Sequence, residues 1–186
     1  ITLQRAKTAR EAIRVMTDLV KTHGYASEGE SFSIADGEEA WIMDLIGKGK
    51  ADKGAVWVAR RVPDGHIAGH ANHPRIHRFP LKDKSGETLY SPDVIKFARS
   101  QGYFDGKDEE FDFSKAYGVT DFGALRGCDA RVWAYFNLFT PGMDKYLPWI
   151  DRAEGDPMPL WVKPEKPLSA ADMKRAMRDH FEGTPY

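Results

Sequence analysis

The sequence contains very little cysteine: Cys128 is the single one among 186 residues. One cysteine excludes an internal disulfide and argues strongly against a cysteine-based metal site. Such sparing use of cysteine is typical of a protein from a reducing compartment.

The chain also lacks an excess of charge of either sign and any long apolar run. It has 27 Lys and Arg against 28 Asp and Glu, so the formal net charge is -1. This balance gives no electrostatic reason to expect nucleic acid or an acidic membrane surface as a partner. No apolar run approaches the roughly 20 residues that a membrane helix needs, and no signal peptide is visible. We therefore expect neither nucleic acid nor a membrane among the partners.

Hydrophobic residues make up 41% of the sequence and aromatic residues 12%, which is enough to form the core of one globular domain over residues 1–186. Thr8 and Glu11 have capping-box spacing and open a predicted helix that Gly24 closes. Alternation around Asp36-Gly37 predicts a β-hairpin. The segments "GAVWVARR" and "HIAGHA" predict a third and a fourth strand, the third apolar on both faces.

After residue 80 helical patterns dominate. Ser91 as N-cap, Pro92 and Gly102 predict a helix between them. Further helices are predicted in "DFGALRGCDARVWAYFNLF", in "MDKYLPWI" with a break at Pro148, and from Ser169 onward. We therefore expect an α+β fold: residues 8–80 form a helix plus antiparallel strands, and residues 81–186 form a mainly helical region packed on the sheet.

Four of the six histidines lie in "HIAGHANHPRIHRF", at positions 66, 70, 73 and 77. On a helix this spacing would bring all four within reach of one metal ion. Gly69 and Pro74 interrupt a helix, however, and the local alternation favours a strand. We therefore predict no metal site and favour histidines at a polar sheet edge or cleft, with a metal hydrolase as an alternative. Asn72, expected at the end of the strand, can direct an amide N–H at an oxygen that becomes negative during acyl transfer.

Cys128 offers a further alternative, a thiol hydrolase that pairs this cysteine with one of the clustered histidines. Its surroundings in the sequence favour a small core residue in a helix instead.

Several blocks, taken together, closely resemble the dipeptidase A family of cysteine peptidases, which are relatives of the secernins and N-terminal-nucleophile hydrolases. They are "GESFSIADGEEAWIMDLIGKG", "GAVWVARRVPDGHIAGHANHPRI", "LYSPDVIKFARSQGYFDG", "RGCDARVWAYF" and "PLWVKPEKPLSAADMKRAMRDHFEGTP". The resemblance implies a four-layer αββα sandwich of antiparallel sheets covered by helices. It also implies hydrolysis of unblocked dipeptides by an N-terminal cysteine whose own α-amino group is the general base. It implies no metal and no organic cofactor.

The resemblance also nominates site residues. "HANHPRI" resembles the pattern that supplies the oxyanion-hole asparagine in the related penicillin acylases, which makes Asn72 the expected oxyanion donor. "CDARVWAYF" resembles their active-site arginine segment, which nominates Arg131 to hold a substrate carboxylate or to tune the thiolate. An ordinary salt bridge is the alternative role for Arg131. His70, in the same stretch as Asn72, is the predicted substrate-binding residue.

The chain departs from the family pattern at its first residue, because the family's processed chain begins with cysteine and this one begins with Ile1. We therefore expect a central segment of a longer enzyme, inactive alone. A non-catalytic scaffold or binding protein of the same fold is the alternative. The resemblance implies a cytoplasmic location, with export in a bacterium as the alternative. An exposed sheet edge would allow copies of the chain to associate.

Overall fold

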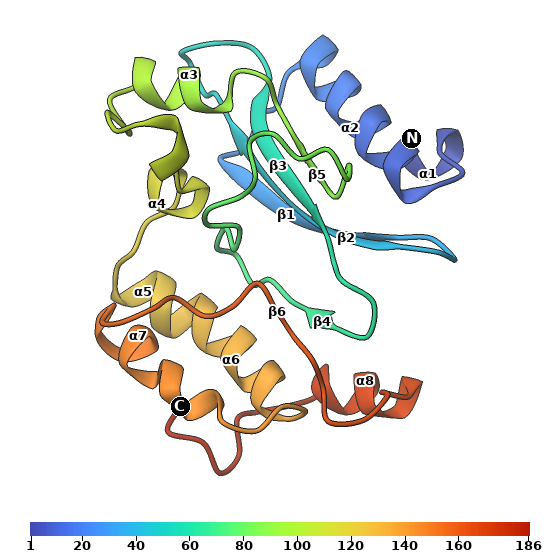
Figure 1. The fold of residues 1–186 in the computed structure, drawn as a ribbon, viewed down its shortest axis with the longest axis vertical. Coiled ribbons are helices and arrows are strands. Elements are labelled where there is room, and N and C mark those ends of the chain that lie inside the picture. Colours follow the sequence, from blue (N-terminus) through green and yellow to red (C-terminus); the bar gives the residue numbers. More distant parts are fainter. The chain divides into compact units, whose positions relative to one another are not determined.

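The computed structural model describes all 186 residues, Ile1–Tyr186, which form two compact units (Figure 1). Residues 1–62 and 74–118 make up the first, called the sheet unit here. Residues 63–73 and 119–186 make up the second, called the helical unit. The predicted α+β class, with an antiparallel sheet and helices, is confirmed, and it is compatible with the expected sandwich.

The sheet unit is built on a four-stranded antiparallel sheet in the order β1-β2-β3-β5. Its strands are β1 (Gly29–Ala35), β2 (Ala40–Gly47), β3 (Ala55–Arg61) and β5 (Thr88–Tyr90). The hairpin β1-β2 and the strand β3 confirm the sequence prediction. The three-residue strand β5 was not predicted, because so short a segment shows no alternation.

Helix α2 (Ala9–His23) packs on one face of this sheet (Figure 1). Thr8 caps it as predicted, since its hydroxyl accepts a hydrogen bond from the Glu11 backbone N–H at 3.2 Å. The Glu11 carboxylate accepts from the Lys7 backbone N–H, so the second half of the capping box is displaced by one residue. Ala9 and Ile13 pack against Trp41 and other apolar residues of the central strands.

The opposite face of the sheet is also buried: Asp44, Val56 and Val58 are at most 1% exposed. Helix α3 (Val94–Ser100) packs against β3, and its N-cap is Asp93. The prediction that Ser91 is the N-cap is wrong. The Ser91 hydroxyl instead accepts a hydrogen bond from the Trp57 backbone N–H at 3.1 Å. The unit is completed by short elements: α1 (Thr2–Arg5), η1 (Asp108–Glu110) and α4 (Phe113–Tyr117).

The helical unit gathers short helices and one strand pair around its own apolar core. These elements are α5 (Phe122–Ala124), η2 (Leu125–Asp129), α6 (Ala130–Asn137), η3 (Met143–Tyr146), α7 (Leu147–Arg152) and α8 (Ala170–Ala176). Pro148 lies in the first turn of α7, where no N–H is needed, so it starts this helix instead of breaking it. Ser169 and Asp172 form the capping box of α8.

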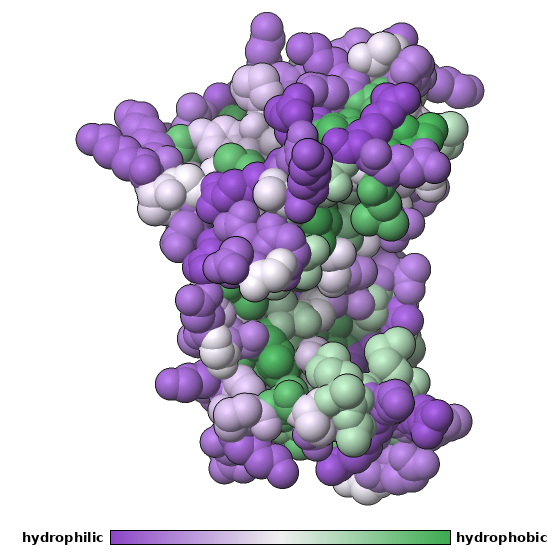
Figure 2. All heavy atoms as spheres, turned by 90° about the vertical axis from the view of Figure 1, so that its right-hand side faces the viewer, coloured by the Kyte–Doolittle hydropathy of each residue, from purple (hydrophilic) through white to green (hydrophobic).

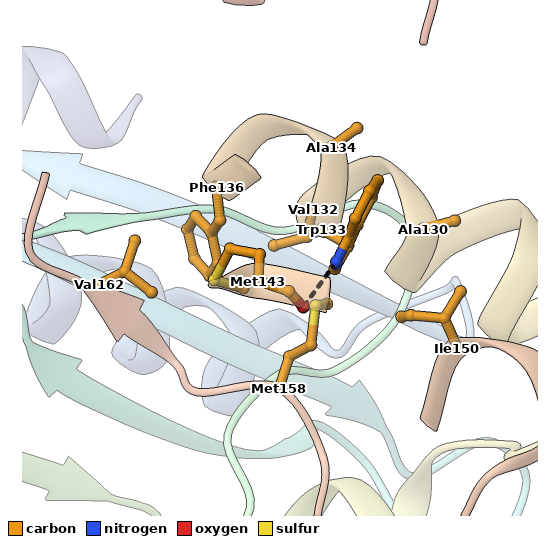
Figure 3. Packing of buried hydrophobic residues seen from close by; sticks show 9 residues of the cluster. All are labelled: Ala130, Val132, Trp133, Ala134, Phe136, Met143, Ile150, Met158 and Val162. Atoms are coloured by element: carbon orange, nitrogen blue, oxygen red, sulfur yellow. Dashed lines mark hydrogen bonds between the residues drawn. The ribbon is translucent and has the colours of Figure 1, made fainter. Parts of the chain in front are cut away.

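The core of the helical unit centres on Trp133, which is 1% exposed (Figure 3). Its indole N–H donates to the Met143 carbonyl oxygen at 2.9 Å, so its polar atom is satisfied inside the core (Figure 3). Ile150 from α7 and Val162 pack into the same cluster. Helix α6 is thereby held firmly, which matters because it carries Arg131.

The predicted fourth strand is mostly wrong. Only β4 (Ile67–Ala68) is extended, and it pairs with β6 (Trp161–Val162) in a separate two-stranded antiparallel sheet. The segment "HIAGHA" therefore belongs to the helical unit and is not part of the main sheet.

Apolar side chains also reach the surface of the sheet unit. Figure 2 shows them over the N-terminal helices, where Ile1 is 71% and Leu3 is 93% exposed. A groove there is lined by Leu3, Phe32 and Ile34 and runs beside β1, an edge strand of the sheet. Association of copies through this edge stays a prediction. None of the helices has both the length and the apolar character needed to cross a membrane.

Candidate active site

Asn72 lies in a bend of the helical unit, four residues beyond the end of β4, and not at the end of a strand as predicted. Its φ of 54° is in the left-handed region, which asparagine tolerates better than most residues. Just before it, Gly69 lies so close to α6 that an added Cβ would be 3.1 Å from a ring carbon of Tyr135. Glycine thus lets this segment approach the helix that carries Arg131.

Arg131 follows an irregular turn. Residues Leu125–Asp129 form a π-helical turn between α5 and α6, a feature often found at functional sites. The Arg131 Nε donates to the Gly127 carbonyl oxygen at 2.7 Å, and Nη2 donates to the Asn72 Oδ1 at 2.8 Å. A longer contact joins Nη2 to the Ala71 carbonyl oxygen at 3.4 Å. The two residues nominated by resemblance are therefore in direct contact.

This contact determines how the Asn72 amide is oriented. A guanidinium group has only donors, so the group that faces it must be the amide oxygen of Asn72. The two hydrogens on Nδ2 are then directed away from Arg131. Both side chains are exposed, so these hydrogens can reach a bound molecule. The arrangement presents a fixed hydrogen-bond donor, as an oxyanion hole requires.

A buried polar cluster lies directly beside Asn72. His73 is 5% exposed and Asp129 is 1% exposed, and the His73 Nδ1 is 2.9 Å from the Asp129 Oδ1. The Trp149 indole N–H donates to the other carboxylate oxygen at 3.0 Å. Sequence reasoning missed Asp129 altogether. A signal was available, because an aspartate inside the apolar pattern "CDARVWAYF" needs a partner when the helix is buried.

Cys128 is half-buried, and its thiol lies 3.7 Å from the Asn72 carbonyl oxygen. It belongs to the π-helical turn and not to the apolar core. The contact observed for this thiol is with the main chain, and the nearby His73 directs its Nδ1 to Asp129. The geometry therefore gives no support to a Cys128–histidine pair.

The four clustered histidines go to different places. The His66 Nδ1 lies 3.1 Å from the Asp64 carbonyl oxygen, His73 binds Asp129, and His77 binds Asp112 in the sheet unit. His70 is half-buried two residues before Asn72, and its substrate-binding role stays a prediction. No three side chains among His, Cys, Asp and Glu are grouped as metal ligands would be.

The pair of His77 and Asp112 makes stability depend on pH. Burial alone would raise the pKa of Asp112, but the hydrogen bond and the charge of His77 outweigh it and hold the pKa below its usual range. A depressed carboxyl pKa adds stability above the ordinary value near pH 4 that is lost as pH falls through the lowered value.

We expect Asp112→Asn to lower the free energy of unfolding by about 1 kcal/mol at pH 6, because it removes a charge-assisted hydrogen bond. The side-chain oxygen of the asparagine can still accept a hydrogen bond from the Lys115 backbone N–H and so cap α4. The substitution therefore tests the loss of the negative charge separately from the loss of the cap. Urea unfolding of both proteins from pH 6 to pH 3 measures this difference, which should shrink as pH falls below the ordinary carboxyl pKa toward the lowered pKa of Asp112. A difference that stays constant would contradict the assignment.

The sequence model of Peptidase family C69 matches residues 1–186. The chain belongs to this peptidase family. The resemblance to the dipeptidase A family is confirmed, since the family's curated relatives include "Dipeptidase A" of Lactobacillus helveticus, 24% identical over 192 residues.

Two further relatives cover the whole of this chain. The "Probable dipeptidase" of Salmonella dublin is 27% identical over 186 residues, and the match spans 40% of its length. The "Dipeptidase" of Bifidobacterium longum is 27% identical over 199 residues, and the match spans 35% of its length. The chain therefore spans well under half the length of each of these relatives.

Proposed function

We propose that the chain is part of a cysteine-type dipeptidase that hydrolyses unblocked dipeptides. The observation that carries this proposal is the contact of 2.8 Å between Arg131 and the amide oxygen of Asn72, which turns the Nδ2 donor outward. Membership of the C69 family and relatives named as dipeptidases support the substrate class.

The proposed nucleophile is the thiolate of an N-terminal cysteine in a part of the enzyme outside residues 1–186. Its sulfur attacks the scissile carbonyl carbon, and the C=O electron pair moves to the oxygen, which the Asn72 Nδ2–H stabilises. The intermediate collapses when the C–N bond breaks, and the leaving amine takes a proton from the α-ammonium group of the cysteine. Water then hydrolyses the thioester and releases the first amino acid.

Arg131 has a supporting role in this scheme. Two of its contacts, with Gly127 and Asn72, hold its guanidinium within the site. A positive charge beside the bound dipeptide attracts its carboxylate and also favours the developing oxyanion. His70, close in sequence to Asn72, is proposed to contact the substrate.

The test uses the full-length protein and two substrates, a simple dipeptide and its N-acetylated form. We expect hydrolysis of the free dipeptide and at least a roughly tenfold lower kcat/KM for the blocked one, because the proposed substrates are unblocked dipeptides and a charged group removed from a binding site weakens its hydrogen bonds. Mass spectrometry of the mature protein should identify cysteine as its first residue. Absence of dipeptide hydrolysis, or a mature chain that begins with a residue other than Cys, would overturn the proposed mechanism.

A further inference from the structure

The buried pair of His73 and Asp129 joins the two backbone segments that carry Asn72 and Arg131. His73 follows Asn72 directly, and Asp129 is the last residue of the π-helical turn, two positions before Arg131. The 2.9 Å contact between their side chains is therefore a cross-link between the bend and the start of α6. Trp149 extends it to α7 through the second oxygen of Asp129.

Both segments have backbone conformations that need such support. Asn72 has a φ of 54°, and the turn before α6 is π-helical. Such uncommon backbone conformations cost free energy, so they are stable only where contacts with the surrounding structure offset that cost. The exposed contact between Arg131 and Asn72 competes with water, whereas the link between His73 and Asp129 is excluded from it.

The contact with Asp129 also fixes which ring nitrogen is the donor. A carboxylate has no hydrogen to donate, so Nδ1–H of His73 donates to Asp129, whose other oxygen accepts from Trp149. The Nε2 atom of His73 is buried and has no hydrogen-bond partner. Of the two ring nitrogens, Nδ1 therefore makes the hydrogen bond that connects His73 to the rest of the structure.

We propose that His73 and Asp129 are positioning residues that hold Asn72 and Arg131 at their working separation. Neither is proposed to touch substrate. His73 acts through Asn72, the residue before it, and Asp129 acts through Arg131, two positions further along the chain. The inference rests on the proposed dipeptidase function for its kinetic test, and a second measurement makes it independent of activity.

The decisive variants are His73→Asn and His73→Gln in the full-length enzyme. The amide nitrogen of asparagine occupies the place of Nδ1, whereas that of glutamine reaches the place of Nε2. We expect His73→Asn to keep kcat within about threefold of wild type. His73→Gln should lose roughly 10- to 100-fold in kcat with little change in KM, because a small misplacement of the donor affects the transition state most.

The same two substitutions at His66 are the matched control, because that ring contacts only a local carbonyl oxygen in the same unit. They should leave kcat unchanged. Trp149→Phe removes one donor to Asp129 and leaves His73 intact, so it keeps the proposal testable if His73→Gln fails to fold. We expect Trp149→Phe to lower kcat about threefold to tenfold with KM unchanged, by the same misplacement.

Backbone hydrogen exchange supplies the measurement that does not depend on activity. Peptides that cover residues 70–75 and 125–133 should exchange faster in His73→Gln than in wild type, and His73→Asn should match wild type. Equal behaviour of the two His73 variants in exchange, or an active His73→Gln beside an inactive His73→Asn, would overturn the inference. If the wild-type enzyme hydrolyses no dipeptide, the proposed function fails, whereas the exchange comparison still decides this proposal.

Discussion

Replacing Asn72 by alanine in the full-length enzyme is expected to lower kcat for a dipeptide by about 10²–10³-fold, the effect of removing one oxyanion-hole donor. Asn72 is exposed, and its side chain makes its structural contact with Arg131 at 2.8 Å. Its removal should therefore cost little stability. Because the donor acts on charge that develops in the transition state, KM should change much less than kcat.

The control for Asn72→Ala is Arg131→Lys, which keeps the positive charge but cannot reproduce the guanidinium contacts with Gly127 and Asn72 together. We expect it to lower kcat less than Asn72→Ala does, because the donor is loosened but still present. Steady-state kinetics and thermal unfolding of the three proteins measure both effects. A kcat for Asn72→Ala within about threefold of wild type would contradict the role of Asn72 as the oxyanion donor.

The second large effect concerns Asp44, a buried carboxyl group on β2 of the sheet unit. One oxygen accepts from the Arg75 and Ile76 backbone N–H groups at 2.7 and 2.8 Å, and the other lies 2.5 Å from the Ser31 hydroxyl. Asp44→Ala leaves all three groups without this partner, at roughly 1–3 kcal/mol for each. We therefore expect the free energy of unfolding to fall by about 3 kcal/mol or more.

Asp44→Asn is the matched variant. Its oxygen can accept from the two backbone N–H groups while its amide donates to Ser31, as a protonated Asp44 would. Burial raises the pKa of Asp44 against the opposing hydrogen bonds from Ser31 and the two backbone groups. A raised carboxyl pKa adds stability below the ordinary value near pH 4, and this stability is lost as pH rises through the raised value.

Urea unfolding of wild type, Asp44→Ala and Asp44→Asn from pH 4 to pH 8 separates these effects. Near pH 4, we expect the free energy of unfolding of Asp44→Asn to be within about 1 kcal/mol of the wild-type value. As pH rises, the variant should become more stable relative to wild type. If Asp44→Asn is as unstable as Asp44→Ala at every pH, the carboxyl group is ionised throughout and the predicted pH dependence is wrong.

Those parts of the fold with strong local signals were predictable. Helix α2 follows from its cap at Thr8 and its apolar period, and the strands β1 to β3 follow from alternation and the turn at Asp36-Gly37. The pairing of β4 with β6 was not predictable, because each has two residues and their partners lie about 94 residues apart. Such pairs are set by tertiary packing and leave no pattern in the sequence.

The candidate site also contains some residues that the sequence could predict and others that it could not. Asn72 and Arg131 could be nominated because each lies in a short block that resembles a known active-site segment. The partnership of His73 with Asp129 joins residues 56 positions apart, and no local rule links them. The left-handed conformation of Asn72 was also missed, and the contact of its side chain with Arg131 joins residues 59 positions apart.

The proposed role of Asn72 as the oxyanion donor can be tested by a crystal structure of the full-length protein with an aldehyde analogue of a dipeptide. The aldehyde would form a tetrahedral adduct with the thiol of the proposed N-terminal cysteine, and its oxygen would mark the place of the oxyanion. We expect this oxygen about 2.7–3.1 Å from the Asn72 Nδ2, with Arg131 still bound to the Asn72 Oδ1. An adduct oxygen bound by other donors, with Asn72 turned away from it, would show that Asn72 is not the oxyanion donor.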